Sequence, residues 1–143
     1  MFETLEKMFL EAKQDICITL SSKDLSLWLT RAIDHTLEKM AKAGTSIRIV
    51  THIGKGDIDE IERVSRFCDI RHMEDVHYQI SIVDGRKAIM GTPTSDALSR
   101  NYSDTYVSTG EKGLIETLKA SFERTWEISV SAHDRIISLK REQ

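Results

Sequence analysis

Three polar side chains alternate with apolar ones in the middle of the chain: His77, Gln79 and Ser81. Successive side chains of a strand point to opposite faces, so these three would share one face of a strand predicted over residues 76–83. The other face would be apolar, formed by Tyr78, Ile80 and Ile82. A polar row of this kind is either solvated or lines a polar site, because buried polar groups need hydrogen-bond partners.

A hairpin is predicted directly after this strand. The dipeptide Asp84-Gly85 is a strong signal for a tight turn, because both central positions of such a turn take positive φ. Residues 87–90 then form the returning strand, which ends at Gly91. Residues 95–103 are polar and are expected to form a loop beside the polar row.

The segment HYQISIVDGRKAIMGTPT, residues 77–94, resembles the signature of the phospholipase D superfamily. That signature reads His-x-Lys, four residues, Asp, six residues, Gly-Ser/Thr-x-Asn/Thr. The matching positions, at the correct spacing, are His77, Asp84, Gly91, Thr92 and Thr94. One position departs from the signature, because its lysine is replaced here by Gln79.

The resemblance implies a catalytic pair, His77 as the nucleophile on phosphorus and Asp84 as its orienting partner, in vestigial or weak form. It also implies a ligand-binding set of four residues, His77, Gln79, Thr92 and Thr94. Glutamine can donate a hydrogen bond but brings no charge. Losing a charge-assisted contact costs roughly 1.5–3 kcal/mol.

A cation from elsewhere in the chain could replace the missing lysine. Arg86 and Lys87 lie at the predicted turn, at the far end of the strand from Gln79, and are poor substitutes. Three arginines remain possible substitutes for the lysine, because sequence alone cannot place them: Arg48, Arg71 and Arg100.

Length and composition predict one α/β domain over residues 1–143. The formal net charge of −3 gives no general attraction to nucleic acid or to an anionic membrane. Apolar runs are too short to cross a bilayer, so we expect a cytoplasmic protein without a membrane partner. Cys17 and Cys68 are predicted to be buried thiols. The histidines outside the signature show no metal-ligand spacing, and neither a metal nor a cofactor is predicted.

The remaining elements predict a mixed central β-sheet flanked by helices. Strands are expected over residues 15–20, 45–53, 68–74 and 104–109, and helices over 22–43, 57–67 and 111–128. The strand–helix–strand order at 15–53 favours parallel neighbours joined by a right-handed crossover. The phospholipase D resemblance extends over most of residues 12–127, and with one copy of the signature it implies half of a two-chain site.

Amphipathic helices are predicted at both ends of the chain. Residues 1–14 carry an apolar seam of Phe2, Leu5, Phe9 and Ala12. That seam either packs on the core or continues a coiled coil or dimer contact. A short helix is expected over residues 131–143, opened by the capping-box spacing of Ser131 and Asp134.

Three functions remain open from sequence. The first is a catalytically impaired sensory domain that binds a small polar or anionic ligand, similar to the effector-binding part of archaeal TrmB-type transcription regulators. A DNA-binding domain would then precede it, outside these residues. The second is a homodimeric phosphodiesterase or nuclease of the phospholipase D superfamily. The third is a purely structural dimerisation domain. A homodimer is expected in each case.

Overall fold

A computed structural model describes residues 2–91 and 106–142 of the chain. The helices are α1 (Phe2–Leu10), α2 (Ser22–Thr30), α3 (Ile33–Lys42), the 3₁₀ turn η1 (Lys55–Asp57), α4 (Ile58–Val64), α5 (Lys112–Ile128) and α6 (Ala132–Arg141). The strands are β1 (Asp15–Thr19), β2 (Ser46–Thr51), β3 (Asp69–His72), β4 (Gln79–Val83), β5 (Lys87–Gly91), β6 (Tyr106–Thr109) and β7 (Val130–Ser131).

The described strands form one mixed sheet in the order β6-β5-β4-β1-β2-β3-β7. β1, β2 and β3 run parallel, as the strand–helix–strand order predicts. β4 lies antiparallel to β1, and the predicted hairpin pairs β4 with β5. Asp84 and Gly85 both take positive φ in its turn, at 54° and 62°. The mixed α/β architecture predicted from sequence is therefore confirmed.

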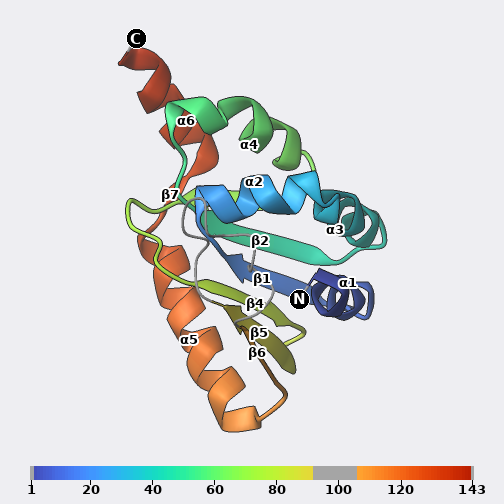
Figure 1. Cartoon of the computed structure of the whole chain (residues 1–143). Coiled ribbons are helices and arrows are strands. Elements are labelled where there is room, and N and C mark those ends of the chain that lie inside the picture. The colour runs from blue at the N-terminus through green and yellow to red at the C-terminus, as the bar shows by residue number, and fades with distance from the viewer. Residues whose placement is uncertain (1, 92–105, 143) are drawn as a thin grey trace.

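Helices cover both faces of this sheet (Figure 1). On one face, apolar residues of α1, α2, α3, α4 and α6 pack on the inward side chains of β1, β2 and β3, such as Ile16, Ile18 and Ile49. On the other face, α5 packs on the residues that alternate with these, including Cys17 and Val50. Both faces bury apolar surface, which is the main favourable term in folding.

The prediction of one helix over residues 22–43 is wrong in one respect, because the chain forms two helices there, α2 and α3. Ala32 adopts a left-handed backbone, with φ of 59°, and no glycine or proline marks the position. The break turns the chain so that Trp28 of α2 and Leu37 of α3 are both buried in the same core. Gly44, at φ of 100°, ends α3 as expected.

Two further boundaries differ from the sequence prediction. α1 ends at Leu10, four residues early, and its seam lies in the core: Leu5 and Phe9 are fully buried, with Phe2 packed against them. The core-packing alternative therefore accounts for the seam. β4 begins at Gln79, so His77 lies in the loop before the strand and not in it.

A layer of paired charges joins α5 to the sheet. The carboxylate of Glu123 accepts from both terminal nitrogens of Arg48, at 2.7 Å each, and forms an ion pair with Lys119. The Arg48 guanidinium also lies 5.3 Å from the centre of the Trp126 ring. The hydrogen bonds from Arg48 lower the pKa of Glu123 to about 2.

Glu123→Gln should therefore destabilise the protein at neutral pH, by about 1 kcal/mol for a partly exposed pair. The pKa of Glu123 is lower in the folded chain than its ordinary value of 4.5, so its contribution is complete above pH 4.5. That contribution is lost as the pH falls toward 2. Denaturant unfolding of both proteins at several pH values measures the difference. Glu127→Gln, an exposed site on the same helix, is the matched control; equal losses for the two variants would contradict the pairing.

Candidate functional site

One edge of the sheet carries Gln79 and Gly91 of the signature segment, with His77 in the loop that leads into it. The carboxyl ends of parallel β1, β2 and β3 meet the beginning of antiparallel β4 at this edge. Gln79 opens β4 there and pairs with Gly91 at the end of β5, which in turn pairs with Tyr106 at the start of β6. We call this the carboxyl edge. In open α/β sheets, such edges are where ligands bind.

Gln79 is the buried centre of the predicted polar row. It is 2% exposed, and Ser81 is 1% exposed. Ile82 belongs to the cluster under α5, so Gln79 and Ser81 face the opposite side of the sheet. His77 is exposed in the loop before them. Thr92 and Thr94 lie outside the described residues.

Asp84 lies at the other end of β4, in the turn of the hairpin. Its carboxylate accepts hydrogen bonds from the backbone N–H groups of Lys13, Gln14 and Asp15, at 2.9, 2.7 and 3.0 Å. It lies five positions along the chain from Gln79, roughly 17 Å in an extended strand. The expected orienting contact between Asp84 and His77 is therefore not found within the described chain. Asp84 instead ties the hairpin to the segment that leads into β1.

The charge on Asp84 is stabilised by these contacts. Partial burial raises its pKa, but the N–H groups of Gln14, Lys13 and Asp15, together with Arg86, outweigh that effect and bring the pKa below its ordinary value. The carboxylate is therefore ionised at neutral pH and acts as a clamp between two segments of backbone.

Two of the proposed substitute cations are engaged on the α5 face. Arg48 pairs with Glu123, and Arg71 donates to the Trp126 carbonyl at 2.7 Å while stacking on that ring. Both therefore lie on the face opposite Gln79. Lys87 forms an ion pair with Glu11 at the hairpin end of the sheet. Arg100 lies outside the described residues.

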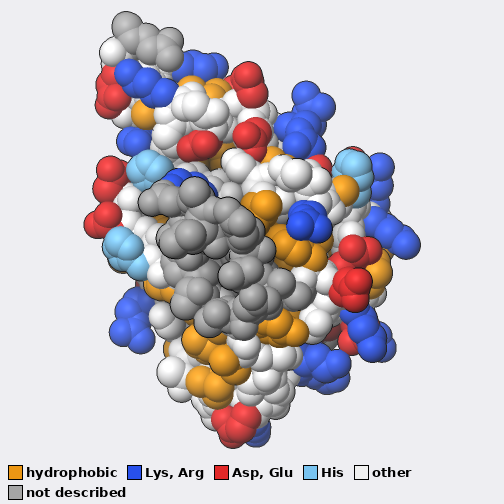
Figure 2. All heavy atoms as spheres, viewed as in Figure 1, with side chains coloured by type: hydrophobic (Ala, Val, Ile, Leu, Met, Phe, Trp, Pro, Cys, Tyr) orange, Lys and Arg blue, Asp and Glu red, His pale blue; other side chains and the backbone are white. Residues whose placement is uncertain are grey.

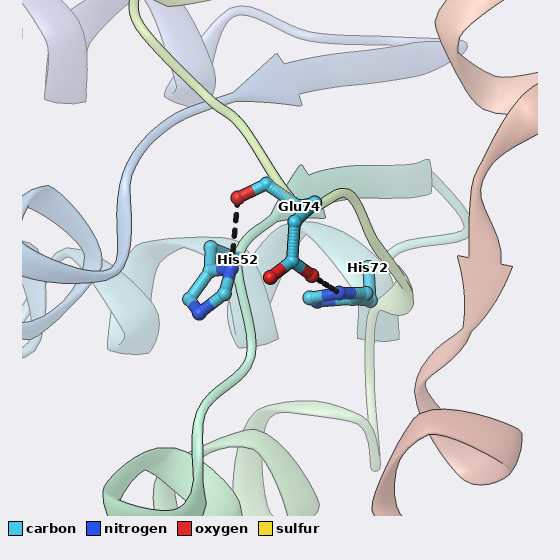
Figure 3. Close-up of side chains that lie close together, drawn as sticks. All are labelled: His52, His72 and Glu74. Atoms are coloured by element: carbon cyan, nitrogen blue, oxygen red, sulfur yellow. Dashed lines mark hydrogen bonds and ion pairs between the residues drawn. The ribbon is translucent and has the colours of Figure 1, made fainter. Parts of the chain in front are cut away.

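A second group of polar side chains follows β2 and β3 at the same edge (Figure 3). The ring centres of His52 and His72 lie 5.0 Å apart. Nδ1 of His52 lies 3.0 Å from the backbone oxygen of Glu74, and Nε2 of His72 lies 3.1 Å from the carboxylate of Glu74. We call these three residues the histidine cluster.

The hydrogen bonds fix the protonation of both rings. Nδ1 of His72 accepts from the backbone N–H of Ile53 at 2.9 Å, so the proton of the neutral ring lies on Nε2 and is donated to Glu74. Nδ1 of His52 must carry a proton to bond the Glu74 carbonyl. Burial lowers the pKa of His72 despite its bond to Glu74.

Side chains of the histidine cluster are of the types that hold transition metals, and their ligand atoms lie within 4.8 Å of one another. A metal at Nε2 of His72 would move its proton to Nδ1, which would then face the Ile53 N–H. Two donors would oppose each other at 2.9 Å. The hydrogen bonds therefore favour a proton over a metal ion between His72 and Glu74.

Sequence spacing did not reveal the histidine cluster. His52 and His72 are far apart in sequence but each follows or ends one of two neighbouring parallel strands, with Thr51 paired to His72. The available signal was that two predicted strands, residues 45–53 and 68–74, each carry a histidine near their carboxyl end. Figure 2 shows histidine and acidic side chains gathered where Figure 1 places the loop between β3 and β4.

Searches of solved structures find similar folds at low sequence identity. One is TrmBL2, described as an archaeal chromatin protein with a novel mode of DNA binding, with a TM-score of 0.68 and 13% identity over 91% of this chain. Another is NucT from Helicobacter pylori, with a TM-score of 0.65 and 16% identity over 91% of this chain. This chain spans 50% of the TrmBL2 chain and 89% of the NucT chain.

These likenesses confirm the predicted fold. The chain has a phospholipase D-like α/β fold that resembles TrmB-type proteins. Scans against models of protein families and against curated protein sequences gave no match. None of the described helices is long and apolar enough to cross a bilayer.

Asp84→Asn should lower the free energy of unfolding by about 2 kcal/mol, because three charge-assisted hydrogen bonds lose their charge. Asparagine tolerates the left-handed backbone at this position, so the loss reports the carboxylate. The folded-state pKa is lowered, so the difference between the proteins should shrink as the pH falls below the ordinary value of 3.8. Denaturant titration measures it. Asp75→Asn, at an exposed site, is the control, and an equally small effect from both would contradict the clamp.

Proposed function

We propose that this chain is a ligand-binding sensory domain with a phospholipase D-like fold and little or no catalytic activity. The ligand is small and polar or anionic, and it binds at the carboxyl edge. The observation that carries the proposal is Gln79: a neutral side chain, 2% exposed, occupies the position of the signature lysine. His77 and Gln79 would contact the ligand, together with Thr92 and Thr94.

Electrostatics support binding over hydrolysis. Charge on a phosphodiester grows toward the transition state, and each lost donor costs about 2.7–4 kcal/mol there. Arg48 and Arg71, which could have supplied the charge, are held on the opposite face by Glu123 and Trp126. The Asp84 carboxylate is committed to the backbone of residues 13–15. A binding site tolerates these losses better than a catalytic one.

The regulatory context is part of the proposal. We place residues 1–143 as one effector domain of a cytoplasmic transcription regulator, with a DNA-binding domain in a preceding segment. The support is the fold shared with TrmBL2, of which this chain spans half. Two copies would share the pocket, because one chain carries one copy of the signature.

A homodimeric phosphodiesterase is the second candidate. Its support is that this chain matches nearly the whole length of the NucT chain, and that His77 stands exposed beside the carboxyl edge. Hydrolysis of bis-p-nitrophenyl phosphate that disappears in His77→Ala and persists in His133→Ala would favour this candidate over the sensory domain.

Gln79→Lys should tighten sulfate or phosphate binding about tenfold, the size of one charge-assisted hydrogen bond of about 1.5 kcal/mol. Isothermal titration calorimetry measures it. Gln14→Lys is the matched control: it adds the same charge at an exposed position on the hairpin side of the sheet. Equal affinity for Gln79→Lys and the parent protein would show that this edge is not the anion site.

Light scattering tests the shared pocket separately. We expect a dimer at tens of micromolar protein, because the proposed site needs residues from two chains. A monomer that still binds sulfate through His77 would remove the dimer from the proposal and leave the ligand site. A monomer without anion binding would remove both.

A further inference from the structure

The histidine cluster extends the pairing of β2 and β3 beyond the ends of the strands (Figure 3). The last backbone contact is from the N–H of Met73 to the carbonyl of Thr51, at 3.0 Å. Beyond it, side chains continue the connection: His72 accepts from the Ile53 N–H, and His52 donates to the Glu74 carbonyl. Two backbone segments, residues 52–53 and 72–74, are thus joined through imidazole rings.

His72 holds a central place in this connection. Its ring is the buried member of the cluster, 6% exposed, and both of its nitrogens are used. On the far side of Ile53, the guanidinium of Arg135 in α6 donates to the Ile53 carbonyl at 2.9 Å. Ile53 is therefore held by its N–H and by its carbonyl, which fixes the end of β2.

Protonation of His72 is incompatible with this arrangement. A second ring proton would go to Nδ1, where it would face the N–H of Ile53 instead of accepting from it. Two neighbouring groups, His52 after β2 and Arg135 on α6, oppose protonation of the ring, while Glu74 favours it. A further acidic residue near the ring is Asp134 of α6, which lines the same shallow pocket as His72, Met73 and Val130.

We propose that His72 is a pH-sensitive latch whose protonation separates residues 52–53 from residues 72–74 and releases the loop, residues 73–78, that carries His77. The proton comes from solvent and binds Nδ1 of the ring. The latch requires no ligand, so this proposal can be tested independently of the proposed sensory function. Where a ligand does bind through His77, acid pH would weaken its binding through protonation of His72, which lies outside the ligand site.

The direction of the pH dependence follows from burial. The pKa of His72 is lower in the folded chain than its ordinary value of 6.5, mainly because the ring is buried. The open form therefore takes up a proton that the closed form does not hold. At pH values between the pKa of His72 in the folded chain and 6.5, opening of the latch becomes up to about tenfold more favourable for each unit that the pH falls.

Amide hydrogen exchange measured by NMR tests the latch. The protection factor of the Ile53 amide should fall progressively as the pH drops from 7.5 to 5, while amides of the central strand β1, such as that of Ile18, keep theirs. His72→Asn should remove this pH dependence, because the Oδ1 of asparagine can accept from Ile53 as Nδ1 does but does not titrate. His133→Asn, at an exposed histidine, should leave it unchanged.

The nitrogen shifts of the His72 ring give a readout on the unaltered protein. At pH 7.5 they should show a proton on Nε2 and a lone pair on Nδ1. The opposite tautomer overturns the proposal. So does protection of Ile53 that stays constant to pH 5, or that falls equally in the parent protein and in His72→Asn.

Discussion

The antiparallel pairing of β4 with β1 is the constraint on which the rest of this structure depends. It inserts the hairpin beside three parallel strands, and so brings the start of β4 to the edge where β1, β2 and β3 end. The Asp84 carboxylate secures the opposite end by binding the backbone that enters β1. One residue of the signature thus fixes the strand whose other end begins with Gln79 and follows the loop that carries His77.

The sheet also separates the paired charges of β2 and α5 from the proposed site. Arg48 of β2 pairs with Glu123 of α5, which also pairs with Lys119 of the same helix, and this pairing joins α5 to the sheet. Gln79 faces the other side of the sheet, as Ser81 does, and both side chains are buried. A neutral, buried side chain such as Gln79 suits recognition by hydrogen bonds, whereas phosphoryl transfer needs fixed positive charge. The placement of Arg48 on the α5 face therefore supports the proposal that the domain binds a ligand without hydrolysing it.

Local sequence signals predicted local structure well. The Asp84-Gly85 turn and the cap at Ser131, whose hydroxyl accepts from the N–H of Asp134, both form as expected. Contacts between distant segments could not be read in this way. The partners of Asp84 lie about seventy residues earlier, and His52 meets His72 because their strands are neighbours. The break at Ala32 has no glycine or proline to mark it, since packing on the core decides it.

A titration of the ¹⁵N-labelled protein with sulfate, followed by amide shifts, tests the central claim that the carboxyl edge is the binding site. The account predicts that the largest shifts fall on the ends of β1 and β2 and on residues 73–79, and that residues 13–15 and 84–87 at the hairpin end change little. Shifts concentrated at the hairpin end, or none at all at millimolar sulfate, would contradict it.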